Sequence, residues 1–125
     1  MAKPEYEFFD VEKVPFTACA GEVRELTERV LATDEVAGTA TRILHFEPGT
    51  DTTPNGVQVH DFWEEVYIVS GSMTDLELGQ TFTAGMYACR PPGMRHGPWR
   101  SDEGCTTFEV RYRIHDRTPI EGETQ

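Results

Sequence analysis

Short runs of β-branched and aromatic residues recur along the chain, separated by clusters of glycine, proline and small polar residues. The runs occupy residues 39–46, 65–72, 80–84, 85–90 and 106–114. Turn clusters such as EPGTDTTPNG, RPPG and SDEG lie between them. This rhythm of short strands and turns is typical of an antiparallel β-sandwich or β-barrel.

Residues 23–35 are the exception to this pattern. Val23, Leu26 and Val30 have near-helical spacing, and good helix formers lie between them, so a helix is favoured locally. The segment also fits an alternating pattern, and the alternative is a strand at the edge of the sheet. The two alternating sets are Val23, Glu25, Thr27 and Arg29, and Arg24, Leu26, Glu28 and Val30. Residues 115–125 are polar, contain a proline and a glycine, and are predicted to form a loose tail.

Polar groups that are costly to bury interrupt the strand-like stretch 57–72. Gln58 and His60 are two residues apart, so on a strand their side chains point to the same face. Glu64 follows across a short corner and can join them. The sequence therefore predicts that these three polar side chains converge.

A fourth polar group is predicted to arrive from the turn at residues 91–93. Pro91, Pro92 and Gly93 favour a tight turn that places His96 near the start of the next strand. Two imidazoles, a carboxylate and an amide oxygen suit Fe, Mn, Ni, Co or Zn. A metal ion would also stabilise the buried carboxylate, so we predict a metal site with the ligands Gln58, His60, Glu64 and His96.

Length and charge limit the possible partners. The chain has 125 residues, enough for one domain with a hydrophobic core, and a net charge of −11, which disfavours nucleic acid and anionic membranes. Its three cysteines lack metal-type spacing and suit reduced thiols. There is neither a bilayer-spanning apolar run nor a basic-then-apolar leader, and we expect a cytoplasmic protein.

The two candidate motifs resemble those of the cupin superfamily. The first cupin motif, G-x5-H-x-H-x3–4-E-x6-G, is matched from its second histidine onward by His60, Glu64 and Gly71, with Gln58 in the place of the first histidine. The second motif, G-x5-P-x-G-x2-H, is matched by Gly85, Pro91, Gly93 and His96, and Arg100 replaces its closing asparagine. Two motifs at a plausible separation are a stronger signal than one.

Residues 64–105 are similar to the ChrR-type cupins in particular, through a strand with Glu64, Glu65, Val69 and Gly71, a PPG-x-x-H turn and a late Gly-Cys pair. The resemblance implies an all-β cupin double-stranded β-helix, that is, a jelly-roll barrel. It implies a single domain over residues 1–125, with its core at about 38–114 and an N-terminal extension of strands. The superfamily habit of pairing barrels implies a homodimer, to which residues 6–16 would contribute.

The glutamine at position 58 leaves two ligand sets open. An amide oxygen can ligate a metal, and sugar-phosphate isomerases of the superfamily use such a Gln-x-His pair. If Gln58 is a spectator, His60, Glu64 and His96 remain as the two-histidine, one-carboxylate set of non-haem Fe(II) oxygenases. A domain that kept the fold and lost the metal, with both histidines in structural roles, is the remaining alternative.

Aromatic and arginine side chains near the motifs are candidates for substrate contacts. Aromatic rings at a barrel mouth favour a flat, apolar or aromatic substrate, and an arginine fork suits a carboxylate or enolate. Ordinary packing and surface charge pairing are the alternatives. The predicted substrate-binding residues are Phe62, Trp63, Arg90, Trp99, Arg100 and Phe108, and Arg42, Arg95, Arg111 and Arg113 are further candidates.

Four nearby residues are expected to have other roles. Glu65 is predicted to face solvent or to accept a hydrogen bond beside the site, because the spacing to Gly71 favours Glu64 as the ligand. His45 is a lone histidine on a strand, for which a structural role is more common. Cys89 and Cys105 are predicted to be small buried hydrophobic residues.

These predictions lead to a metal-dependent enzyme acting on a small organic molecule. The favoured cofactor is one divalent ion, Fe²⁺ ahead of Zn²⁺, Mn²⁺ or Ni²⁺, and the favoured reaction is a non-haem dioxygenation of an aromatic or dicarbonyl compound. Glu64 is the expected catalytic residue, as a ligand that becomes a base if it detaches. The alternatives are a non-redox isomerase or lyase, and a non-catalytic zinc-binding ligand or redox sensor of the ChrR anti-sigma type.

Overall fold

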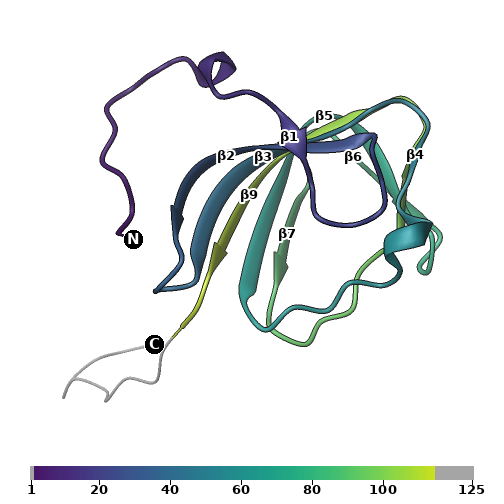
Figure 1. The fold of residues 1–125 in the computed structure, drawn as a ribbon. Helices are drawn as coiled ribbons and strands as arrows, with labels where there is room; N and C mark the ends of the chain where they lie inside the picture. Colours follow the sequence, from purple (N-terminus) through teal and green to yellow (C-terminus); the bar gives the residue numbers. More distant parts are fainter. Residues whose placement is uncertain (1, 115–125) are drawn as a thin grey trace.

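The computed structural model describes residues 2–114, so the predicted tail at 115–125 lies outside the described part (Figure 1). Its regular elements are antiparallel strands and two short 3-10 turns, and the all-β prediction is confirmed. In chain order they are η1 (Val11–Lys13), β1 (Thr17–Ala18), β2 (Leu26–Asp34), β3 (Thr39–Phe46), β4 (Thr50–Asp51), η2 (Thr53–Asn55), β5 (Trp63–Asp75), β6 (Gln80–Thr83), β7 (Tyr87–Arg90), β8 (Trp99–Ser101) and β9 (Cys105–Tyr112).

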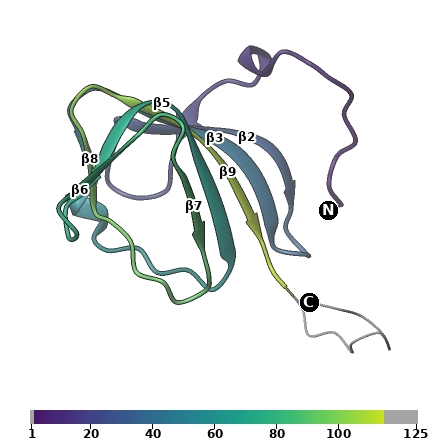
Figure 2. The same cartoon turned by 180° about the vertical axis from the view of Figure 1, so that it is seen from behind.

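The strands form one curled antiparallel sheet with β5 at its centre. The order along the main path is β1-β2-β3-β9-β5-β8-β4, and β6 and β7 also pair with β5. The first part of β5 pairs with β9 and β7, and its last residues pair with β6 and β8. Figures 1 and 2 show the two halves of the sheet facing each other across the interior.

Gly71 allows β5 to bend between its two sets of partners. The pairing of β5 with β9 shifts register between Ile68 and Ser70, just before this glycine. Gly71 has φ +80°, and a Cβ there would lie 2.0 Å from the carbonyl oxygen of Gly104. Only a residue without a side chain fits this close approach of two backbones.

Replacing Gly71 with alanine is expected to lower the free energy of unfolding by at least about 2 kcal/mol, because backbone strain and a backbone clash add together. Gly79 is the matched control, since it has φ +69° but open space around its Cβ position. The Gly79→Ala variant is expected to lose only about 1 kcal/mol. Urea unfolding measures both, and equal losses would contradict the role given to the contact with Gly104.

The helix predicted over residues 23–35 is wrong, because this segment forms strand β2. Its backbone pairs with β3 from Leu26 opposite Phe46 to Asp34 opposite Thr39, with one irregularity between Val30 and Ala32. The side chain of Leu26 is buried, whereas Val30 is 41% exposed. Long-range hydrogen bonds to a neighbouring strand therefore outweigh the local helix propensity.

The hydrophobic core occupies only part of the interior. It consists of Val23, Leu26, Leu44, Phe46, Ile68, Met73, Trp99 and Cys105, with Cys19 and Phe82 packed against it. On β9 the inward positions change from Cys105 to polar residues, while Phe108 on the opposite face is 38% exposed. Within residues 2–114, no helix is long and apolar enough to cross a membrane.

Candidate metal centre

His60, Glu64 and His96 come together inside the curled sheet. One potential ligand atom from each lies within 4.8 Å of the other two. His96 Nε2 is 3.8 Å from Glu64 Oε1, and the two imidazole rings have centroids 4.9 Å apart. Glu64 and His96 are 2% and 7% exposed, whereas His60 is half-buried and keeps some contact with water.

Backbone contacts bring the two sequence motifs together. The N–H of Gln58 donates to the carbonyl of His96 at 2.8 Å, and the N–H of His96 donates back at 3.0 Å. The N–H of Gly93 donates to the carbonyl of His60 at 2.9 Å. The segment around Gln58 and the turn after β7 thus hold each other in register, which places both histidines beside Glu64 on β5.

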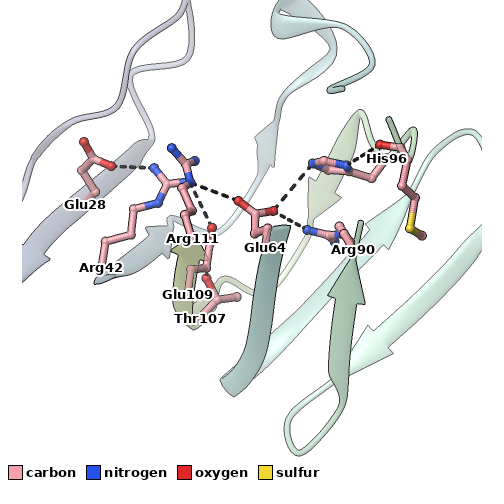
Figure 3. A network of polar contacts seen from close by, with 9 residues as sticks. Glu28, Arg42, Glu64, Arg90, His96, Thr107, Glu109 and Arg111 are labelled. Carbon is pink, nitrogen blue, oxygen red and sulfur yellow. Dashed lines mark hydrogen bonds and ion pairs between the residues drawn. The ribbon is translucent and has the colours of Figure 1, made fainter. Parts of the chain in front are cut away.

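Two arginines flank the Glu64 carboxylate. In the strand register Glu64 lies opposite Arg111 on β9 and opposite Arg90 on β7. Arg90 Nη1 donates to Oε1 at 2.8 Å, and Arg111 Nε donates to Oε2 at 3.2 Å. Figure 3 shows the carboxylate between these two side chains, with His96 on the side of Arg90.

The environment prepares these groups for binding a cation. Burial by itself raises the pKa of Glu64, but Arg111 and Arg90 outweigh it, so that the pKa is lowered and the group is a carboxylate at neutral pH. Burial lowers the pKa of His60, and it lowers that of His96 to about 4. Both imidazoles are therefore neutral at pH 7, which is the form that ligates metals.

A second charged network lies beside the first. Arg42 on β3 donates to Glu28 at 2.6 Å and to Glu109 at 3.0 Å, and Thr107 Oγ1 donates to Glu109 at 3.1 Å. Burial raises the pKa of Glu109, and the charge of Arg42 opposes this rise. Among the residues that the structure describes, Arg42 Nε is a buried donor without a hydrogen-bond partner. Figure 3 includes this network, next to Arg111.

Both networks line one cavity of about 350 Å³. Two neutral imidazoles and an ionised carboxylate within ligand reach fit a divalent transition metal, so this cluster could bind one metal ion. Gln58 also lines the cavity, and its Nε2 donates to the carbonyl of Asn55 at 2.9 Å. Its amide nitrogen therefore has a partner within the chain, and ligation through the amide oxygen stays a prediction.

The structure brings only some of the predicted substrate-binding residues to the cavity. Arg90 and Trp99 line it, and Phe62 lies next to it, with its ring stacked on His60 at 4.5 Å. Arg111 and Arg42, which were further candidates on strands, also line it. Arg95 lies outside it and pairs with Glu77.

Trp63, Arg100 and Phe108 do not line this cavity, and the substrate contacts predicted for them stay predictions. Trp63 stacks on Tyr112 with centroids 6.4 Å apart, and Arg100 is exposed and pairs with Asp102 at 2.9 Å. Phe108 lies on the outer face of β9. Neighbouring residues of a strand point to opposite faces, and these three positions have the outward orientation.

Three of the four remaining residues lie where they were predicted and one does not. Glu65 is partly exposed and accepts a hydrogen bond from Tyr87. His45 lies outside the cavity, beside Thr106 and Phe16. Cys105 is buried, but Cys89 is exposed because it alternates with the inward-facing Arg90 on β7.

Sequence reasoning missed Glu28 and Glu109, which complete the charged lining. A signal for Glu109 was present, because Thr107, Glu109 and Arg111 form one face of β9, while Phe108, Val110 and Tyr112 form the other. The polar face of a strand is usually assigned to the solvent side. In a sheet that surrounds a polar cavity, the polar face points inward instead. Glu28 carried no such signal, since a helix was favoured for its segment and an edge strand was only the alternative.

Comparisons with known proteins agree with this architecture. The family model of the ChrR Cupin-like domain matches residues 5–114. A comparison with curated protein sequences finds no match. Among solved structures, an RmlC-like cupin from Shewanella frigidimarina has a TM-score of 0.69 and 20% sequence identity, and the match covers 93% of this chain and 97% of the other.

Two further structures have names that describe an activity. An acetylacetone dioxygenase from Acinetobacter johnsonii has a TM-score of 0.68 and 16% identity, with 87% of this chain and 74% of the other covered. The polyketide cyclase RemF from Streptomyces resistomycificus has a TM-score of 0.68 and 18% identity, with 86% and 80% covered. At these identities the likeness shows a shared cupin fold. Together with the family match, which spans most of the chain, it identifies the protein as a member of the ChrR cupin-like domain family.

Proposed function

We propose that the protein is a metal-dependent enzyme that binds one divalent ion at His60, Glu64 and His96 and acts on a small organic anion. Fe²⁺ is the proposed ion and dioxygenation of an aromatic or dicarbonyl compound is the proposed reaction. The observation that carries this proposal is the pair of arginines on both sides of the carboxylate ligand.

The charge balance of the site favours an anionic substrate. Arg90 and Arg111 both pair with Glu64, and Arg42 is already compensated by Glu28 and Glu109. The three arginines of the cavity are formally balanced by its three carboxylates, so a bound divalent ion leaves an excess of two positive charges, next to the arginine pair on Glu64. Such an excess is costly unless an anion compensates for it, and an enolate or carboxylate would do so.

The residues around the carboxylate can then have separate roles in substrate binding and proton transfer. The guanidinium groups of Arg90 and Arg111 are placed to bind the anionic oxygens, and Trp99 forms an apolar wall against the rest of the substrate. Glu64 can hold a proton from the substrate if it detaches from the ion, because its arginine neighbours remain to orient it. The ion would supply Lewis acidity and, as Fe²⁺, reactivity with dioxygen.

The comparisons support this choice of substrate class. Acetylacetone is a dicarbonyl compound that loses a proton to give an enolate anion, and an enzyme named for its dioxygenation shares this fold. The same charge pattern would serve a non-redox isomerase or lyase. The ChrR name of the family keeps a zinc-binding sensor as the alternative from another class.

Metal analysis followed by oxygen uptake tests the proposal. Protein purified without chelators is expected to carry one iron per chain and to consume oxygen with a member of a panel of β-diketones, hydroxyaryl ketones and phenols. In Arg90→Met we expect kcat/KM to fall by at least about 100-fold. Arg100→Met is the matched control, because Arg100 is exposed and outside the cavity, and it should retain the parent activity.

Other results would lead to different conclusions. Tightly bound zinc with no turnover would contradict the enzyme and favour the sensor. Substrate conversion without oxygen loss would favour the isomerase or lyase.

The homodimer and the cytoplasmic location stay predictions. Light scattering of the purified protein would check the homodimer.

A further inference from the structure

A second cavity lies beside the charged one and differs from it in chemistry. It has a volume of about 140 Å³ and lies between the edge strand β7 and strands β5, β6 and β8. Its lining includes Val66, Ile68, Met73, Phe82, Met86 and Ala88. The polar Asp75 also contributes to the lining, but its carboxylate already accepts hydrogen bonds from the backbone N–H groups of Glu77, Leu78 and Gly97.

The two cavities adjoin each other. Val66, Met73, Arg90, His96 and Trp99 line both of them. Arg90 contributes its charged end to the Glu64 ion pair, and its guanidinium carbon lies 5.4 Å from the centre of the Trp99 ring. A molecule held at the metal cluster by its anionic oxygens would therefore have an apolar space within reach of its other end.

We propose that this apolar cavity binds the apolar end of the substrate, a group about the size of a phenyl ring. This inference rests on the proposed function, which supplies the anionic end of the same molecule. The substrate class becomes an aryl-substituted enolate or carboxylate, in place of a compound with only small alkyl groups.

Size and lining favour an aromatic group. Apolar protein cavities of roughly 150 Å³ bind benzene, and the present one has about 140 Å³. The lining includes the thioethers of Met73, Met86 and Met94, which adapt their shape and make favourable contacts with aromatic rings. At its rim, Met86 and Met94 are each 45% exposed and Leu78 is 65% exposed. Apolar side chains grouped at the mouth of a cavity are typical of a ligand site.

Ala88 allows a sharp test. It lines the apolar cavity and not the charged one, so that Ala88→Ile would fill the former and leave the metal ligands in place. Cys89 is the matched control, because it is the next residue of the same strand and is exposed on the other face. Ala88→Val is a milder filling variant, in case the isoleucine prevents folding.

The experiment compares two diketones and toluene on the metal-loaded protein. Dissociation constants are measured by calorimetry for 1-phenyl-1,3-butanedione and 2,4-pentanedione, and toluene binding is followed by NMR. The phenyl compound is expected to bind at least about tenfold more tightly. Ala88→Ile should reduce this preference to about twofold and abolish toluene binding. Ala88→Val should lower the preference and weaken toluene binding to a smaller extent. Cys89→Ile should match the parent in both measurements.

The outcomes separate this inference from the proposed function. If both diketones bind with equal affinity and toluene does not bind, the apolar site is overturned while the anionic site stands. If toluene binds in the parent but not in Ala88→Ile, and neither diketone binds, the cavity stands as an apolar site and its link to an enolate substrate is overturned. A phenyl preference that is unchanged in Ala88→Ile would overturn the location.

Discussion

Replacing Glu64 with glutamine is expected to lower the free energy of unfolding of the metal-free protein by about 3 kcal/mol. The carboxylate is 2% exposed and is the shared partner of Arg90 and Arg111, whose charges are left without compensation in the variant. The glutamine has the same shape, so packing contributes little to the loss. Urea unfolding in the presence of a chelator measures the effect.

Glu65 provides the matched control, because it is the next residue of β5, lies on the opposite face of the strand and is partly exposed. The Glu65→Gln variant is expected to lose less than about 1 kcal/mol. Adding Arg90→Met to Glu64→Gln should recover part of the loss, since one uncompensated charge is removed together with its partner. If Glu64→Gln and Glu65→Gln were equally stable, the buried charge network would not have the energetic role described above.

Replacing His96 with glutamine is expected to weaken binding of Zn²⁺ and Fe²⁺ by more than about 100-fold. One imidazole of a cluster with two imidazoles and one carboxylate is lost, and even residues that only support a ligand contribute about 10–100-fold. The backbone hydrogen bonds between His96 and Gln58 do not involve the ring, so the fold around the site should persist. Competition with a chromophoric chelator measures the affinity without reference to activity.

His45 serves as the control for this substitution. It lies on β3, outside the cavity and beside Thr106. The His45→Gln variant should therefore bind metal as the parent does. His60→Gln should resemble His96→Gln. Equal affinity in the parent and in His96→Gln would show that the three residues do not form the metal site and would remove the basis of the proposed chemistry.

Much of the candidate site could be predicted because its signals are local. The spacing between His60 and Glu64, and the turn at residues 91–93 before His96, are properties of short segments. The choice of Glu64 over Glu65 followed from spacing, and in the structure Glu64 is the one that lies in the cluster with the two histidines, while Glu65 is partly exposed on the other face of β5. Strand alternation makes such a choice almost binary.

Other features could not be predicted because they depend on distant strand pairs. β2 has helix-favouring residues, and only its hydrogen bonds to β3 decide the outcome. Arg111 is 47 positions from Glu64 along the chain and reaches it because β9 lies next to β5 in the sheet. Trp63 and Phe108 have the composition of pocket walls, yet the register of their strands turns them outward.

The sequence by itself determined the all-β architecture and the two motifs that carry the three candidate ligands, because these follow from residue periodicity and short-range turns. The tertiary structure decided which charges surround the ligands: Arg90, Arg111 and the network of Arg42 with Glu28 and Glu109. It also decided that an apolar cavity adjoins the charged one. The physical reason is that cross-strand register brings together side chains far apart in sequence, and no local pattern encodes that register.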